Sequence, residues 1–140
     1  FNLSYIKDRY GFSYVFGDGE TLETSAFNAF YTPDLDRFPS ISFGIEWTHD
    51  ETVASDDQDD FSHYFIGAQF DNIGNGSLGA AIGSKTPYAE DTDAETMWEA
   101  YYAYNYADGI TITPVVYVKE NAATNVDDET GIILKTTFEF

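Results

Sequence analysis

The sequence predicts an all-β fold, in which about nine antiparallel strands form part of a transmembrane β-barrel. The first observation is that apolar and polar side chains alternate along the chain. In the last ten residues, Ile132, Leu134 and Phe138 fall on one face of a strand, whereas the charged Lys135 and Glu139 fall on the other. The second is length, because several such segments approach the about 9–11 residues that a tilted barrel strand needs to cross a bilayer. The third is that long and short connections alternate, as they do between the two ends of an outer-membrane barrel.

The first five segments each alternate between apolar and polar side chains. The fourth is the clearest, because Phe43 and Trp47 alternate with Gly44 and Glu46. The third is ambiguous in phase, since apolar residues fall on both of its faces. The expected strands are Phe1–Ile6, Gly11–Phe16, Thr24–Tyr31, Ile41–His49 and Phe61–Phe70.

The last four segments continue the same design. The seventh sets Trp98 and several tyrosines against Glu99, whereas the eighth is ambiguous in phase. Pro114 in the eighth segment predicts a bulge or a strand end, because proline cannot donate a ladder hydrogen bond. The expected strands are Ser77–Lys85, Thr96–Tyr106, Ile110–Val118 and Gly131–Phe140. No stretch shows the 3.6-residue apolar period of an amphipathic helix.

The connections differ in length and in charge. Ala107–Gly109 and Gly74–Gly76 predict tight turns, because glycine supplies the positive φ that such turns require. Four connections, alternating with the others along the chain, hold most of the 25 acidic residues and only one of the six bases. These connections, which we expect on the outer side of the membrane, are residues 17–23, 50–60, 86–95 and 119–130.

The charges inside the expected strands all fall on the polar face. If the apolar face meets lipid, this polar face lines a water-filled lumen. The predicted pore-lining residues are Glu46, His63, Gln69, Lys85, Glu99, Lys135 and Glu139. Aromatic residues near the two strand ends are typical of membrane interfaces. The predicted interfacial residues are Trp47, Trp98, Tyr106, Phe138 and Phe140.

Composition excludes several other functions. The net charge of −19 makes nucleic acid a poor partner. An enzyme is not expected, because the chain has two histidines, no cysteine and no Gly-x-Ser-x-Gly nucleophile motif. The acidic runs at 56–60 and 127–129 lack the spacing of a calcium loop, so we expect no metal and no cofactor.

Several blocks of the chain resemble the cyanobacterial outer-membrane porins, which are related to the OprB family of carbohydrate-selective porins and are often labelled iron-uptake porins. The resembling blocks are Asn28–Pro33, Phe38–Gly44, Ile66–Phe70, Ser77–Gly83, Trp98–Tyr102, Ile110–Pro114 and Gly131–Phe140. The resemblance covers nearly all of the chain, but only the C-terminal part of such a porin. It implies a barrel of roughly sixteen strands, whose earlier strands and periplasmic surface-layer-homology module lie outside these residues.

The resemblance also implies a function. It predicts passive diffusion of small hydrophilic solutes, either sugars or inorganic ions, through a cyanobacterial outer membrane. The expected partners are outer-membrane lipid, the assembly machinery that recognises the last strand, and two further copies, since porins of this size are commonly homotrimers. The acidic outer loops predict a modest cation preference.

Two other functions are compatible with alternating strands. A soluble extracellular β-sandwich that serves as a binding module would explain the alternation and the acidic loops. A small eight-stranded barrel would have a lumen filled by side chains and would not conduct.

Overall fold

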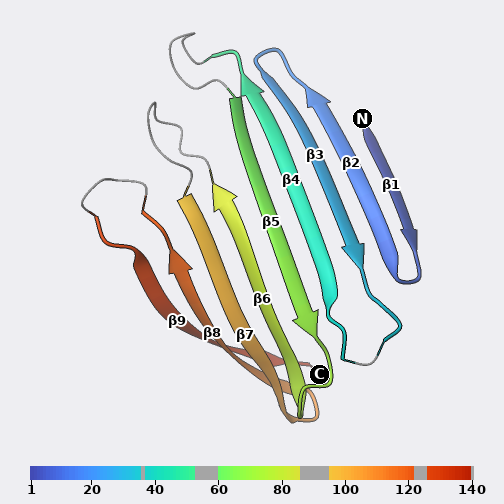
Figure 1. The fold of residues 1–140 in the computed structure, drawn as a ribbon, viewed down its shortest axis with the longest axis vertical. Helices are drawn as coiled ribbons and strands as arrows, with labels where there is room; N and C mark the ends of the chain where they lie inside the picture. Colours follow the sequence, from blue (N-terminus) through green and yellow to red (C-terminus); the bar gives the residue numbers. More distant parts are fainter. Residues whose placement is uncertain (36, 53–59, 86–94, 122–125, 140) are drawn as a thin grey trace.

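The computed structural model is a single sheet of nine strands (Figure 1). It describes residues 1–35, 37–52, 60–85, 95–121 and 126–139, except for the side chains of Phe61 and Lys85. The strands are β1 Asn2–Lys7, β2 Tyr10–Asp18, β3 Leu22–Tyr31, β4 Ser40–Asp50, β5 Asp60–Phe70, β6 Gly76–Lys85, β7 Glu95–Ala107, β8 Ile110–Lys119 and β9 Glu129–Phe138. The described residues include no helix that could cross a membrane.

Each strand pairs antiparallel with the next strand in the sequence, in the order β1 to β9. The prediction of nine antiparallel strands is therefore confirmed. Closure into a ring is not observed, because β1 and β9 are both edges of the sheet. Elements make contact only with their sequence neighbours among the described strands. The sheet is thus one layer, and it lacks the second packed sheet that defines a β-sandwich.

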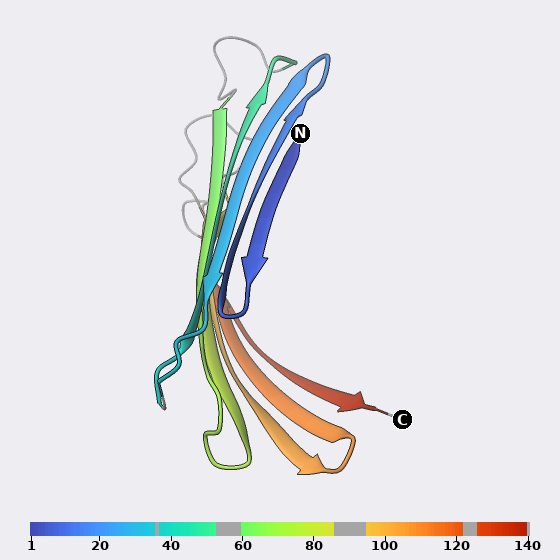
Figure 2. The ribbon, with the colours of Figure 1, turned by 90° about the vertical axis from the view of Figure 1, so that its right-hand side faces the viewer.

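The sheet is bent as well as twisted. Seen from its side, β1 and the end of β9 both lie on the same side of the middle strands (Figure 2). The connections alternate between its two ends. We call the end that bears 19–21, 51–59, 86–94 and 120–128 the loop end, and the end that bears 8–9, 32–39, 71–75 and 108–109 the turn end. Parts of the three longest loop-end connections lie outside the described residues.

The turns explain why the hairpins close where they do. Gly109 has a φ of +69° and Gly74 a φ of +60°, which are conformations that a side chain disfavours. At the turn end, Arg9 forms a 2.6 Å ion pair with Asp34 and so links two connections. The connection predicted at 17–23 is shorter than expected, because β2 continues to Asp18 and β3 already begins at Leu22.

The pairing register puts the apolar sets of all nine strands on the same side. In an antiparallel pair, directly opposite residues share a face. Ile82, for example, lies opposite Ile66 on one neighbour and Trp98 on the other. We call this side the apolar face. The opposite side, which carries Gly67 opposite Ala81 and Ala81 opposite Glu99, is the polar face.

The register also resolves the two strands of ambiguous phase. In β3, Phe27 lies opposite Tyr14 and Ile45, so it belongs to the apolar face. In β8, Val116 lies opposite Ala100 and Ile132, which places it on the same face.

The expected bulge at Pro114 is not observed. Pro114 lies in the middle of β8 and opposite Leu134 of β9, within a continuous register. β8 pairs with β7 at Val115 and again at Ile112, but at neither Pro114 nor Thr113. A local gap in the β7 ladder thus accommodates the missing N–H donor. The bulge lies instead between Asn105 and Ala107, next to the β7–β8 turn.

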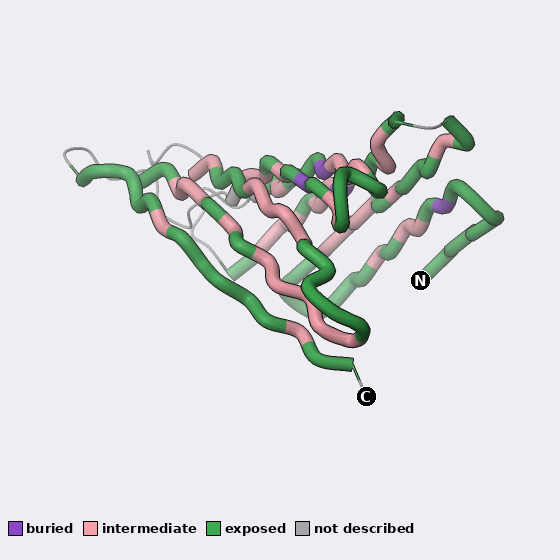
Figure 3. The backbone as a smooth tube through the Cα atoms, turned by 90° about the horizontal axis from the view of Figure 1, so that it is seen from below, coloured by how far each residue is buried: buried purple, intermediate pink, exposed green. Residues whose placement is uncertain are grey.

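The sheet has almost no interior. No large side chain among the described residues is fully buried, and the buried residues are four glycines of the polar face, Gly11, Gly44, Gly67 and Gly79 (Figure 3). On the apolar face of β9, Ile132 is 78% exposed and Leu134 is 69% exposed. Such a sheet exposes both of its faces to its surroundings, and its apolar face has no protein cover within the described chain.

Candidate functional site

The polar face is the best candidate for a functional surface, and its shape comes from glycine–aromatic pairs. Four hairpins each place an aromatic side chain directly opposite a glycine of the partner strand. A β-carbon on any of these glycines would overlap the opposing ring. The pairs are Gly11–Phe30, Gly44–Phe65, Gly79–Tyr101 and Gly131–Tyr117. Each ring therefore lies flat over the glycine of the neighbouring strand and does not project far from the polar face.

This face is the concave side of the bend. A hollow of about 270 Å³ is lined by Ile6 of β1, Phe30 of β3 and Phe65 of β5. A second hollow of about 360 Å³ extends from Phe65 to Ile133 of β9. Each hollow is lined by polar-face side chains of two strands that are separated by three others, β1 and β5 in the first and β5 and β9 in the second. In a flat sheet two such strands would lie roughly 19 Å apart, so the sheet curves towards its polar face. Phe65 therefore lies at the centre of a trough that crosses the whole sheet.

Two of the predicted pore-lining residues form a pair in the trough. Glu46 on β4 lies directly opposite His63 on β5. Together with Asn28 and Phe65 they line a hollow of about 240 Å³. The structure thus places a carboxylate and an imidazole directly opposite each other on the polar face. The sequence predicted only that each residue lies on the polar side of its own strand.

Gln69 anchors a short hydrogen-bond chain nearer the turn end. The Tyr101 hydroxyl donates to Oε1 of Gln69 at 2.5 Å. Nε2 of Gln69 in turn donates to Asp71 at 2.8 Å. This chain holds the Tyr101 ring over Gly79 and links β5 to β7 across β6.

The remaining predicted pore-lining residues are spread along the face. Glu99 lies opposite Ala81 and Tyr117, whereas Lys135 lies opposite Thr113. Lys85 ends β6 opposite Glu95. The placement of Glu139 inside the last strand is wrong, because β9 ends at Phe138. Its backbone N–H donates to Gly109 just beyond the strand, at the turn end.

Three charged residues of the polar face were missed, since the sequence pattern assigned them to loops. Glu95 begins β7, Lys119 ends β8 and Glu129 begins β9. Lys119 forms a 3.5 Å ion pair with Glu95 and lies opposite Glu129 in the register. Glu129 also accepts a 3.0 Å hydrogen bond from the Tyr117 hydroxyl. The signal was present, because Glu95 and Lys119 continue the period-two positions of their strands.

The predicted interfacial aromatics lie mostly on the apolar face. Trp47 and Trp98 lie in the loop-end half of their strands, and Phe138 ends β9 at the turn end. Tyr106 occupies the bulge of β7, and Phe140 lies outside the described residues. The turn-end half of β1–β4 carries a run of ring contacts at centroid distances of 5.7 to 6.5 Å. The rings of this run are Tyr5, Phe12, Phe27 and Phe43.

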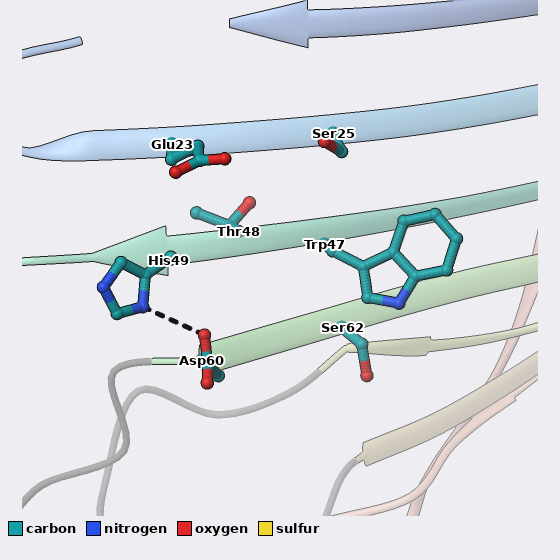
Figure 4. Close-up of a pocket in the computed structure, with 7 residues that line it drawn as sticks. All are labelled: Glu23, Ser25, Trp47, Thr48, His49, Asp60 and Ser62. Carbon is teal, nitrogen blue, oxygen red and sulfur yellow. Dashed lines mark hydrogen bonds and ion pairs between the residues drawn. The ribbon is translucent and has the colours of Figure 1, made fainter. Parts of the chain in front are cut away.

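A hollow of about 440 Å³ interrupts the apolar face near the loop end. Trp47 lines one side of it, and on the other side Nδ1 of His49 lies 3.0 Å from a carboxylate oxygen of Asp60 (Figure 4). Polar groups therefore replace apolar ones on this face as the strands approach the acidic loops. The lining residues are Glu23, Ser25, Trp47, Thr48, His49, Asp60 and Ser62.

Comparison with models of protein families, with curated proteins and with solved structures finds no match for this chain.

Proposed function

We propose that this chain forms part of the wall of an outer-membrane porin, with its apolar face against lipid and its polar face along a water-filled lumen. The observation that carries the proposal is the shared apolar face of all nine strands, which has no protein cover in the described chain. Acyl chains would cover this face, while the antiparallel ladders pair the backbone groups that lipid cannot satisfy.

The polar face supports passive diffusion rather than chemistry. It is a shallow trough that carries small residues, amides, charges of both signs and several apolar side chains, and its hollows are open. The lumen would thus admit small hydrophilic solutes and ions, sugars among them, and select them by size and charge. The acidic loop end predicts a modest preference for cations at the outer mouth. Because mobile ions screen charges over about 8 Å at physiological ionic strength, this preference should weaken as salt rises.

Planar lipid bilayers test this proposal. The natural protein, purified in detergent, is added to one side of a bilayer, and current is recorded under an applied voltage. We expect stepwise conductance increases and a reversal potential that favours cations at low salt. Absence of steps would refute the porin function, whereas steps with a clear anion preference would refute the charge argument alone.

A further inference from the structure

A row of charged residues crosses the polar face near the loop end. The register places Glu46 opposite His63, Lys85 opposite Glu95, and Lys119 opposite Glu129. Continuing the register of the Phe65–Gly83 pair by two residues places His63 opposite Lys85. The charge row thus takes one residue from each of six consecutive strands, β4 to β9, in the order Glu46, His63, Lys85, Glu95, Lys119 and Glu129.

Within the charge row, Glu95 is the carboxylate that is related to both lysines. It lies opposite Lys85 in the register and forms the 3.5 Å ion pair with Lys119. Its side chain is 19% exposed, compared with 41% for Lys119. A single carboxylate, partly shielded from bulk water, therefore pairs with one lysine and lies opposite a second in the register. If Glu95 were neutral, the charge row would have one carboxylate fewer to oppose its two lysines.

We propose that Glu95 sets the contribution of the charge row to ion selectivity, because it pairs with Lys119 and lies opposite Lys85 in the register. With His63 neutral, the row carries three carboxylates and two ammonium groups, so one uncompensated negative charge remains. Loss of the Glu95 charge makes the row neutral and removes its contribution to cation preference. This inference rests on the proposed porin function and locates selectivity at one residue within it.

The test compares reversal potentials of the natural protein and its variants across a salt gradient near 0.1 M. Glu95→Gln should lower the ratio of cation to anion permeability by about threefold, since a charge within a Debye length of the water-filled path is only partly screened. Glu95→Asp keeps the charge and should retain the natural ratio within about a factor of two. Lys119→Gln should shift the ratio in the opposite direction.

Glu23→Gln is the matched control. Glu23 is at the same end of the sheet but on the apolar face, opposite His49. The control removes the same charge and should leave the ratio close to that of the natural protein. A shift as large in Glu23→Gln as in Glu95→Gln would overturn the proposal, because loop-end charge in general would then be responsible.

The outcomes separate the two proposals. No conductance from the natural protein would overturn the porin function itself. Normal conductance with an unchanged ratio in both Glu95→Gln and Lys119→Gln would leave the porin function standing and overturn the role of Glu95. If Glu95→Gln fails to fold, Lys119→Gln decides alone, since an unchanged or lowered ratio in that variant contradicts the charge argument.

Discussion

Two adjacent alanines of β6 allow a direct test of which face meets lipid. Ala80 belongs to the apolar face and lies opposite Ala68 and Ala100. Ala81 belongs to the polar face and lies opposite Gly67 and Glu99. The two residues share a strand, a depth and a side-chain size, so replacing each with arginine changes only the face that receives the charge.

The expected cost of Ala80→Arg follows from its depth. Ala80 is the fifth of the ten residues of β6, which places it near the middle of the bilayer in the proposed orientation. A guanidinium on the lipid face costs about 2–4 kcal/mol at that depth. The ratio of folded to unfolded protein should therefore fall roughly thirtyfold to a thousandfold.

Ala81→Arg should behave differently. Its guanidinium would enter the trough, where Gly67 leaves room and the Glu99 carboxylate offers an opposite charge. An ion pair in water contributes little, so we expect a change within about 1 kcal/mol.

Urea unfolding of the protein in lipid vesicles, followed by the fluorescence of Trp47 and Trp98, measures both variants against the natural protein. Unfolding free energies that are equal for the two variants, or lower for Ala81→Arg, would refute the assignment of the apolar face to lipid. The same pair measured in a detergent micelle checks that the difference does not depend on one lipid mixture.

Three further predictions concern the sheet itself. Gly44→Ala should lower the unfolding free energy by about 1–3 kcal/mol, because the new β-carbon would overlap the Phe65 ring, whereas Gly17→Ala, where nothing lies within 4 Å, should be nearly neutral in the same urea titration. Tyr101→Phe removes the hydroxyl that donates to Gln69 and should cost about 0.5–1.5 kcal/mol; an unchanged midpoint would show that this hydrogen bond is not maintained in solution. Gly109→Ala should lower the unfolding free energy by on the order of 1 kcal/mol, because alanine disfavours a φ of +69°, and a variant as stable as the natural protein would contradict this turn geometry.

Period-two alternation was enough to predict the strands because each strand has one apolar and one polar side. That signal requires no knowledge of neighbours, and it located β4 and β6 to within a residue or two at each end. It failed where one strand has apolar residues on both faces. Phe30 is such a residue, since it lies on the polar face of β3 over Gly11. Only the partner strand reveals that glycine makes room for the ring.

The charge row could not be predicted because it depends on register. Glu95, Lys119 and Glu129 lie at strand ends, where long acidic connections hide the boundary between strand and loop. Their alignment follows from how each hairpin closes, and a shift of one residue would move every side chain to the other face. Whether the sheet closes into a barrel depends on even more of the chain than the register of one hairpin does. Whether two edges meet depends on the summed twist and stagger of all strands, and no single segment encodes these quantities.

The size of the apolar face supports a covering medium as part of the proposed function. Nine strands of about ten residues make a face of roughly 40 by 30 Å. Soluble monomers rarely expose contiguous apolar patches larger than a few hundred Å².

The arrangement of side chains on the apolar face favours lipid over a protein partner. In a protein interface the large aromatic anchors gather at the centre. Here the middle of β6 and β7 holds Ala80 and Ala100, whereas Trp98 lies towards the loop end and Tyr102 and Tyr104 towards the turn end. On these two strands the small residues lie at mid-depth and the aromatic rings lie nearer the two ends, which is the order expected of a surface that meets acyl chains and lipid headgroups.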